Sequence, residues 1–255
     1  MRVVVAGKGG AGKSVIAGTI ARLAARQGAQ VLALDFDLAP GLSISLGSGA
    51  DPVDPPLLLA VERRDGDEWG WRDGVDVATA ALQFATRAPD GIRLLQRGKL
   101  GPDGPESITG SSRAFCEIAR YIGETPEFRG WTLIGDLPAG PRLIAQNWAP
   151  FAHTYLVAVH PSSQSVLAAR RVARLVRLLA PTAAVAFVAS QIESQGDVRH
   201  VERAIGERVL ASVPLDAEVA AAERLCVAPI DHAPDAPAIT AIRGLFTALD
   251  RDAAG

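Results

Sequence analysis

Cysteines and long apolar runs are scarce in this 255-residue sequence, and each scarcity argues against a class of protein. The two cysteines, Cys116 and Cys226, form no Cys-x-x-Cys or Cys-x-Cys pair, so the sequence indicates neither a disulfide framework nor a metal site held within one chain. We expect each to be a small buried apolar side chain. No apolar run approaches the ~18 residues of a membrane-spanning helix, and no basic stretch precedes an apolar one at the start, so we expect a cytoplasmic protein without a membrane-spanning segment.

An excess of charge of one sign is also missing. The formal net charge is −2 at pH 7, which gives no overall electrostatic attraction to nucleic acid or anionic lipid. A local cluster of arginines follows Ser165, at Arg170, Arg171, Arg174 and Arg177. On a helix these side chains form either a solvated polar face or a docking surface.

Apolar residues make up 48% of the sequence, and their pattern predicts an α/β fold. Short apolar runs alternate with segments of helical period, which is typical of repeated βαβ units. We therefore expect a doubly wound, mostly parallel sheet of about seven or eight strands with helices on both faces. We interpret residues 1–255 as a single domain with a less regular, turn-rich insertion at about 48–110. The predicted strands are Val3–Ala6, Val31–Asp35, Ile92–Leu95, Thr132–Asp136, Tyr155–Val159, Val185–Ala189 and Val209–Val213.

A glycine-rich loop follows the first predicted strand directly and precedes a predicted helix. Its residues fit the phosphate-loop pattern G-x-x-x-x-G-K-[ST]. Glycines let backbone N–H groups turn inward around phosphate oxygens, and the following helix N-terminus favours anions. We expect Lys13 to reach the outer phosphates and the Ser14 hydroxyl to hold Mg²⁺. The loop consists of Gly7, Lys8, Gly9, Gly10, Ala11, Gly12, Lys13 and Ser14.

Lysine is rare enough to be informative here. The sequence contains 26 Lys and Arg residues, and its lysines are Lys8, Lys13 and Lys99. The planar fork of arginine does not replace a compact ammonium group inside a tight phosphate cradle, so we expect both lysines of the loop to act on phosphate.

The stretch GKGGAGKS resembles the deviant phosphate loop of the MinD/ParA-type ATPases of the SIMIBI class. In that group the extra lysine crosses a dimer interface to the nucleotide of the partner. The resemblance therefore implies a nucleotide-dependent homodimer in which Lys8 contacts ATP bound to the other subunit.

Carboxylates follow two of the predicted strands. Asp35 and Asp37 stand at the carboxyl end of the second strand, where ligand sites of doubly wound sheets gather. Because strand residues two apart share a face, both carboxylates can point at one Mg²⁺–water cluster. The resemblance assigns Asp37 to the attacking water and Asp35 to a metal-bound water. In WTLIGDLPAGP it assigns Asp136 to Mg²⁺ through water and Gly140 to the γ-phosphate.

The resemblance also indicates the base side of the nucleotide site. Pro214, Leu215 and Asp216 fall where this group packs against adenine. Ser190-Gln191 stands where an Asn-Lys pair would read the base, and Gln191 offers a similar amide. Val15 occupies the position of a usual threonine, so a hydroxyl contact to the α-phosphate is missing while backbone contacts remain.

Across nearly the whole chain, the sequence resembles the CooC-like accessory ATPases of carbon monoxide dehydrogenase. That implies a slow, partner-stimulated, Mg²⁺-dependent ATPase that assists maturation or metal loading of a client metalloenzyme. Two alternatives stay open: a positioning ATPase of the MinD/ParA type, and a nucleotide-binding regulator with little turnover. CooC-like proteins often carry Cys-x-Cys near the dimer interface. Here only Cys116 lies in that neighbourhood, so a Ni or Zn ion would need thiolates from two copies.

Overall fold

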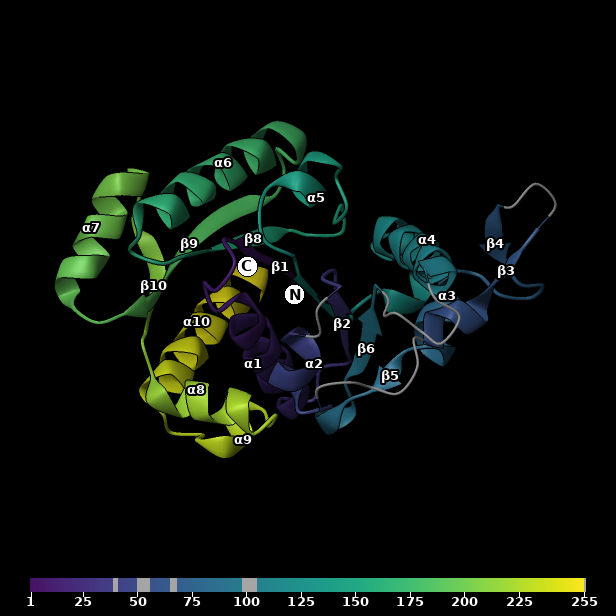
Figure 1. Cartoon of the computed structure of the whole chain (residues 1–255), viewed down its shortest axis with the longest axis horizontal. Coiled ribbons are helices and arrows are strands. Elements are labelled where there is room, and N and C mark those ends of the chain that lie inside the picture. Colours follow the sequence, from purple (N-terminus) through teal and green to yellow (C-terminus); the bar gives the residue numbers. More distant parts are fainter. Residues whose placement is uncertain (39–40, 50–55, 65–67, 98–104, 255) are drawn as a thin grey trace.

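The computed structural model describes residues 1–38, 41–49, 56–64, 68–97 and 105–254 (Figure 1). Lys99 and parts of the 48–110 region lie outside these ranges. Among the described residues, no helix is both long and apolar enough to cross a bilayer.

An eight-stranded sheet forms the centre of the protein, in the order β10-β9-β8-β1-β7-β2-β6-β5. Neighbouring strands are parallel except β5 and β6, which are antiparallel. This confirms the doubly wound, mostly parallel sheet, and each of the seven predicted strands overlaps an observed one. The strands are β1 (Arg2–Gly7), β2 (Val31–Asp35), β5 (Thr86–Arg87), β6 (Arg93–Gln96), β7 (Thr132–Asp136), β8 (Thr154–Val159), β9 (Ala184–Ile192) and β10 (Val209–Pro214).

Helices cover both faces of the sheet, and each face has its own apolar core (Figure 1). Strand β1 shows why: Val3 and Val5 pack on one side, whereas Val4 and Ala6 pack on the other, as alternation along a strand requires. One core includes residues of α1, α2 and α10, and the other includes residues of α4, α6 and α7. The helices are α1 (Lys13–Arg26), α2 (Gly41–Leu46), α3 (Val77–Gln83), α4 (Pro105–Tyr121), α5 (Arg142–Ala145), α6 (Ser163–Leu179), α7 (Gln195–Ile205), α8 (Ala217–Arg224), α9 (Pro229–His232) and α10 (Pro237–Ala254).

The turn-rich region contains more regular structure than the sequence indicated. Besides α3, β5 and β6 it holds two 3-10 helices, η1 (Pro56–Ala60) and η2 (Pro89–Gly91), and an antiparallel pair, β3 (Val61–Arg63) and β4 (Trp69–Trp71). The pair lies against α4, where Trp71 Nε1 donates a hydrogen bond to Glu117 Oε1 at 2.7 Å. Trp71 thus anchors the small sheet to α4.

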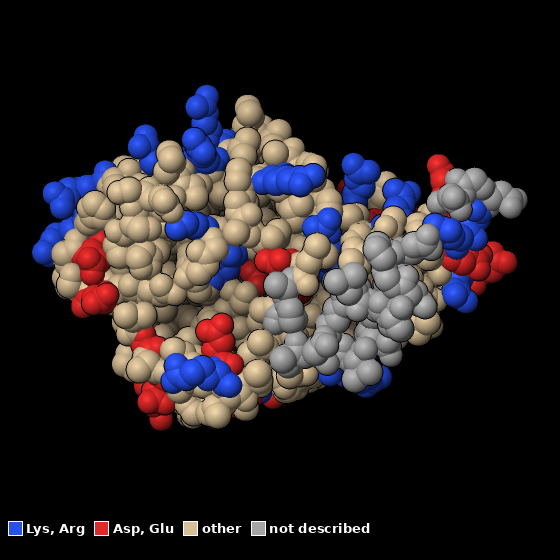
Figure 2. All heavy atoms as spheres, in the orientation of Figure 1, with Lys and Arg blue, Asp and Glu red and all other residues tan. Residues whose placement is uncertain are grey.

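The expectation that both cysteines are small buried apolar side chains was wrong. Cys116 is only partly buried and Cys226 is exposed, with a φ of 54° in the turn after α8, so neither is a core residue. Leu178 of α6 is 71% exposed and does not belong to the apolar face of that helix. The arginines of α6 are exposed as well, and Figure 2 shows Lys and Arg side chains along this edge of the molecule.

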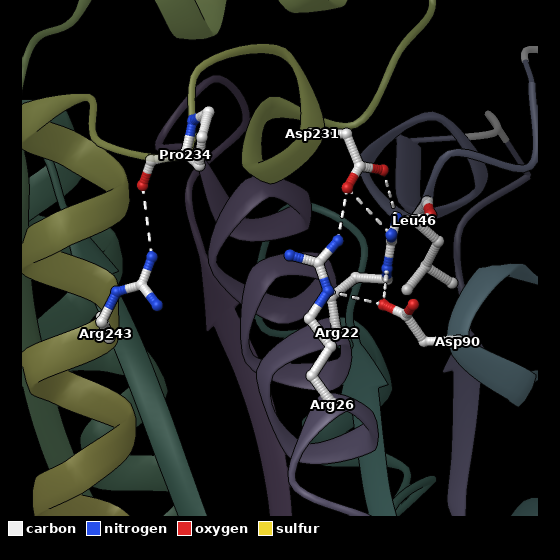
Figure 3. Close-up of polar contacts among 7 residues, drawn as sticks. All are labelled: Arg22, Arg26, Leu46, Asp90, Asp231, Pro234 and Arg243. Atoms are coloured by element: carbon white, nitrogen blue, oxygen red, sulfur yellow. Dashed lines mark hydrogen bonds and ion pairs between the residues drawn. The ribbon is translucent and has the colours of Figure 1, made fainter.

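A buried arginine fixes α1 against three neighbouring segments (Figure 3). Arg22 is 3% exposed, and its Nε donates to Asp90 Oδ2 at 2.6 Å, its Nη1 to Leu46 O at 2.6 Å and its Nη2 to Asp231 Oδ1 at 3.0 Å. Arg26, one turn later, pairs with the same two aspartates from the surface. The helix that follows the glycine loop is thereby tied to α2, η2 and α9.

The Arg22 cluster predicts a stability difference between two chemically identical substitutions. Arg22→Gln should lower the free energy of unfolding by about 2 kcal/mol, because it leaves a buried carbonyl and two carboxylates short of a donor. Arg26→Gln removes an arginine that is 39% exposed and should cost less than about 1 kcal/mol. Urea denaturation of both variants gives the two values, and equal losses would contradict a special role for the buried guanidinium.

Candidate functional site

The glycine loop connects the buried strand β1 to the first turn of α1. Gly12 caps the helix with a φ of 73°, a left-handed conformation, and no side chain caps the helix start. The N–H groups of the first helical turn have no partners within the helix. They face the carboxyl edge of the sheet and are available to an anion.

The two lysines of the loop play different parts in the structure. Lys13 Nζ donates to the Lys8 backbone oxygen at 3.3 Å, so its ammonium group folds back over the loop. Lys8 contributes that carbonyl, and no described residue pairs with its ammonium group.

The Ser14 hydroxyl is held by the acid that ends β7. Ser14 Oγ donates to Asp136 Oδ2 at 2.6 Å. A Cβ on Gly41 would come within 2.6 Å of Ser14 Oγ, so glycine at the start of α2 leaves space for this hydroxyl. The other oxygen, Asp136 Oδ1, is buried without a hydrogen-bond partner among the described residues. A hydroxyl beside a buried carboxylate with an unused oxygen suits a hydrated Mg²⁺.

Burial raises the pKa of Asp136 to about 6, although the Ser14 hydrogen bond and the charge of Lys13 act in the opposite direction. Asp35 is its register partner across the β2–β7 pair. Asp35 is fully buried, and burial and the charge of Asp136 raise its pKa well above the ordinary value. Two desolvated carboxylates at one edge attract a cation.

The sequence predicted that Asp35 and Asp37 share one face of a strand, but they do not. Strand β2 ends at Asp35, and the chain then turns so that the Asp37 N–H donates to Asp35 Oδ1 at 3.0 Å. The Leu42 N–H donates to Asp35 Oδ2 at 3.3 Å. Asp35 therefore holds the acidic loop and the start of α2, while Asp37 is partly exposed and its Oδ1 accepts the Leu38 N–H at 2.8 Å.

Gly140 lies at the turn after β7, with a φ of 91°. Its N–H donates to the Gly7 oxygen at 3.4 Å, so the loop after Asp136 closes against the end of β1. Ala139 also reaches the glycine loop, because a Cβ on Gly9 would lie 3.5 Å from the Ala139 Cβ. The structure thus brings the second predicted loop next to the first.

A pocket of about 380 Å³ extends from the glycine loop to the start of α8. It brings together most of the residues predicted for phosphate and base. Gln191, with a φ of 56°, donates through Nε2 to the Gly10 oxygen at 2.7 Å. The predicted residues among its lining are Gly10, Gly12, Lys13, Ser14, Val15, Gln191, Pro214, Leu215 and Asp216.

Asp216 has a structural task within this pocket. Its Oδ1 accepts the Glu218 N–H at 3.0 Å and its Oδ2 accepts the Ala238 N–H at 3.0 Å, so the carboxylate caps α8 and fixes the start of α10. The contacts predicted to adenine then fall to Pro214 and Leu215, of which Leu215 is 57% exposed.

Two further residues shape the site: Gly41, which sequence reasoning missed, and Ser190, which it placed beside Gln191 without giving it a role. Ser190 is buried, and its Oγ would lie 3.1 Å from a Cβ on Gly12. Their positions after β2 and near the end of β9, at the carboxyl edge of the sheet, were the available signal. Cys116 lies outside this pocket, on α4, and no group of three or more His, Cys, Asp or Glu in the described ranges could hold a metal ion.

Comparison with known proteins gives a family match and a full-length relative. The family described as the CobQ/CobB/MinD/ParA nucleotide binding domain matches residues 2–225. The carbon monoxide dehydrogenase accessory protein CooC of Rhodospirillum rubrum is 26% identical over 244 residues, which cover 92% of this chain and 91% of that protein.

Solved structures share the fold along nearly the whole chain. The septum site-determining protein MinD of Pyrococcus horikoshii, solved with Mg-ADP, superposes with a TM-score of 0.71 at 19% identity and covers 99% of this chain and 97% of its own. A ParA family ATPase of Chlorobium tepidum superposes with a TM-score of 0.70 at 18% identity and covers 96% of this chain and 97% of its own.

The pKa of Asp136 predicts how stability changes with pH without nucleotide and metal. Its folded-state pKa of about 6 exceeds the ordinary aspartate value of 3.8, so the folded state binds the proton more tightly and this group destabilises the fold as pH rises through that window. Asp136→Asn removes the effect. Its free energy of unfolding relative to the wild type should therefore rise by about 2 kcal/mol between pH 4.5 and 7.

Urea denaturation in EDTA measures that difference. Asp235→Asn, which changes an exposed carboxylate outside the pocket, should show no comparable trend. A pH-independent difference for Asp136→Asn would contradict the burial argument.

Proposed function

Because the chain belongs to the CobQ/CobB/MinD/ParA nucleotide-binding family, we propose that it is a Mg²⁺-dependent ATPase and a dimeric switch. We further propose that it assists maturation or metal loading of a metalloenzyme. The observation that carries the ATPase proposal is the Ser14–Asp136 pair beside the glycine loop, since it joins the phosphate cradle to a buried acid with an unused oxygen.

Binding of ATP follows from groups that are already in place. Backbone N–H groups of the glycine loop and the first turn of α1 surround the phosphates. The Lys13 ammonium group moves from the Lys8 carbonyl to the outer phosphates. Gln191, Pro214 and Leu215 line the base side of the pocket.

Hydrolysis depends on the two acidic loops. Mg²⁺, when bound, neutralises charge on the β- and γ-phosphates; Ser14 would bind it directly and Asp136 through water. Asp37 orients the attacking water and accepts its proton, while the Gly140 N–H contacts the γ-phosphate. Asp37 Oδ1 accepts an N–H of its own loop, so the loop must rearrange for catalysis. We therefore propose a slow reaction that a partner stimulates.

Dimerisation is proposed from Lys8. Lys8 is partly exposed, and its ammonium group has no pairing partner in the described ranges, although the residue belongs to the predicted phosphate site. An ammonium group that reaches the phosphates of a second copy would make the dimer depend on ATP, because phosphate charge would otherwise be missing from the interface.

The proposed client rests on the full-length likeness to a carbon monoxide dehydrogenase accessory protein. A positioning ATPase is the second candidate, since MinD and ParA structures share the fold. A nucleotide-binding regulator with little turnover is the third. The first is favoured because CooC is 26% identical over 92% of this chain, whereas the MinD and ParA structures, at 19% and 18% identity, support the fold alone.

A Ni or Zn ion between two Cys116 residues does not fit the surroundings of that thiol. Burial raises the pKa of Cys116, and the positive charges of Arg97, Arg113 and Arg120 act on it. A thiolate in this place would be stabilised by arginines that repel a divalent cation. We therefore derive no step through a transition metal.

Asp37→Ala tests the catalytic assignment. The variant should bind ATP as the wild type does and hydrolyse it at least about 100-fold more slowly, because only the group that positions and deprotonates the water is lost. Fluorescent-nucleotide titration and phosphate release measure the two properties. Asp235→Ala is the control at an exposed aspartate outside the site, and normal turnover of Asp37→Ala would assign the role elsewhere.

The same variant tests the client. Asp37→Ala saturated with ATP should retain its partner, so affinity capture followed by metal analysis should recover a protein of the metalloenzyme class. Capture of DNA or lipid would support the positioning ATPase instead. Recovery of a metal-free protein with no enzymatic activity would support the regulator.

Lys8 variants test the dimer. Lys8→Ala and Lys8→Arg should both abolish ATP-dependent dimerisation while nucleotide binding by the monomer remains, because the cradle of each subunit keeps Lys13. Lys13→Ala is the contrasting variant and should lose nucleotide binding itself. Sedimentation velocity with and without ATP reports the oligomeric state, and a Lys8→Ala protein that dimerises normally would overturn the assignment.

A further inference from the structure

A second pocket, of about 300 Å³, lies between α4 and the segment that follows α5. We call it the arginine pocket. It contains Cys116, which no part of the proposed ATPase mechanism uses. Its lining residues are Arg113, Cys116, Glu117, Arg120, Tyr121, Gln146, Asn147 and Trp148.

The arginine pocket carries an excess of positive charge. Arg113 and Arg120 are exposed and lie two turns apart on α4, and both act electrostatically on Cys116 together with Arg97. The acid of the lining, Glu117, is already engaged, because its Oε1 accepts Trp71 Nε1 at 2.7 Å and its Oε2 lies 3.7 Å from Arg113 Nη2.

The Trp148 ring, which lines the pocket, stacks against a third guanidinium that lies behind it and is not itself a lining residue. The Arg97 guanidinium lies over the Trp148 ring, with Cζ 4.4 Å from the ring centroid. The backbone of Arg97 is fixed, since its N–H donates to the Asp35 oxygen at 3.0 Å and its oxygen accepts from Ser112 Oγ at 3.4 Å. Arg97 Nε is buried without a partner among the described residues, so positive charge is held in place with unused donor capacity.

Size and charge together select the occupant. Small-molecule sites usually measure about 300 to 1,000 Å³. At about 300 Å³ this pocket lies at the lower limit of that range, so it suits one or two side chains rather than a whole cofactor. Guanidinium groups bind carboxylates through paired hydrogen bonds, and an exposed rim allows a chain to enter from outside. We propose that the arginine pocket docks an acidic, carboxylate-bearing peptide segment of a partner protein.

The pocket is connected to both loops of the nucleotide site, on one side through the stacking of Trp148 on Arg97. Arg97 is bonded to the Asp35 carbonyl, and Gln146 to Trp148 directly follow α5, which begins two positions after Gly140. An occupant of the pocket would therefore bias both acidic loops. This coupling rests on the proposed ATPase function, whereas docking itself does not.

The two cysteines allow a test on the intact, nucleotide-free protein. An anionic methanethiosulfonate (2-sulfonatoethyl) and a cationic one (2-trimethylammonioethyl) each react with a thiolate to form a mixed disulfide and release methanesulfinate. Dividing the anionic rate by the cationic rate at each cysteine cancels differences in thiol pKa. Peptide mapping by mass spectrometry gives the rates, with the exposed Cys226 as internal control.

The ratio at Cys116 should exceed the ratio at Cys226 by about tenfold at low salt, as expected for attraction to nearby guanidinium groups. Arg113→Gln combined with Arg120→Gln should bring the two ratios together. Arg170→Gln combined with Arg171→Gln, on the exposed face of α6, should not change them. Equal ratios in the wild-type protein would overturn the proposal.

Protection by peptides identifies the occupant. Hexaglutamate should slow modification of Cys116 by the neutral methyl methanethiosulfonate and leave Cys226 unaffected, whereas hexalysine should protect neither. Absence of protection by hexaglutamate, or equal protection in the Arg113→Gln/Arg120→Gln protein, would overturn the peptide site. Equal protection by glutarate at the same carboxylate concentration would also overturn it, in favour of a free dicarboxylate. ATP hydrolysis measured separately shows whether the proposed function fails independently.

Discussion

Two buried carboxylates side by side are the constraint on which the rest of the site depends. Asp35 ends β2, Asp136 ends β7, and the two are register partners in adjacent strands. Neither is exposed to water, so burial raises the pKa of both. The chain offsets this locally, with two backbone N–H groups on Asp35 and with Ser14 and Lys13 beside Asp136. The remaining oxygen of Asp136 has no described partner, which makes a cation the natural completion of the edge.

The same carboxylates connect the parts that must respond to nucleotide. Asp35 accepts N–H groups from its own loop and from the start of α2, and Arg22 fixes the end of α2 to the helix after the glycine loop. Gly140, in contrast, makes a long backbone hydrogen bond of 3.4 Å to the Gly7 oxygen, and Asp37 lies beyond the end of β2 and is partly exposed. The site therefore combines a buried frame with two more exposed loops, which is the arrangement that the proposed nucleotide switch requires.

Features that depend on local chemistry could be predicted from the sequence, whereas features that depend on tertiary packing could not. The glycine loop and the strands could be predicted because glycine spacing and apolar runs determine them directly. The role of Asp35, which holds the acidic loop and the start of α2, could not be predicted. Strand β2 ends at Asp35, so the alternation of side chains along a strand no longer applies to Asp37. Asp216 was predicted to contact the adenine base, but its carboxylate caps α8 and binds the start of α10. These two helices come together only in the folded protein, so the sequence alone could not indicate this role. Cys226 was predicted to be buried because cysteine usually is, but in the fold it lies exposed in a turn with a left-handed backbone conformation.

The position of the arginine pocket constrains how a partner can act on the switch. Trp148 in one wall stacks against Arg97, whose N–H donates to the carbonyl of Asp35, and another wall continues the loop that begins at Asp136. If ATP changes the two acidic loops, it changes the pocket, and thermodynamic linkage then requires an occupant of the pocket to alter ATP affinity by the same factor. If a partner binds the pocket equally well in both nucleotide states, ATP hydrolysis does not change how much of the partner is bound. Selective docking, rather than tight docking, is therefore the property that would turn this ATPase into a signal.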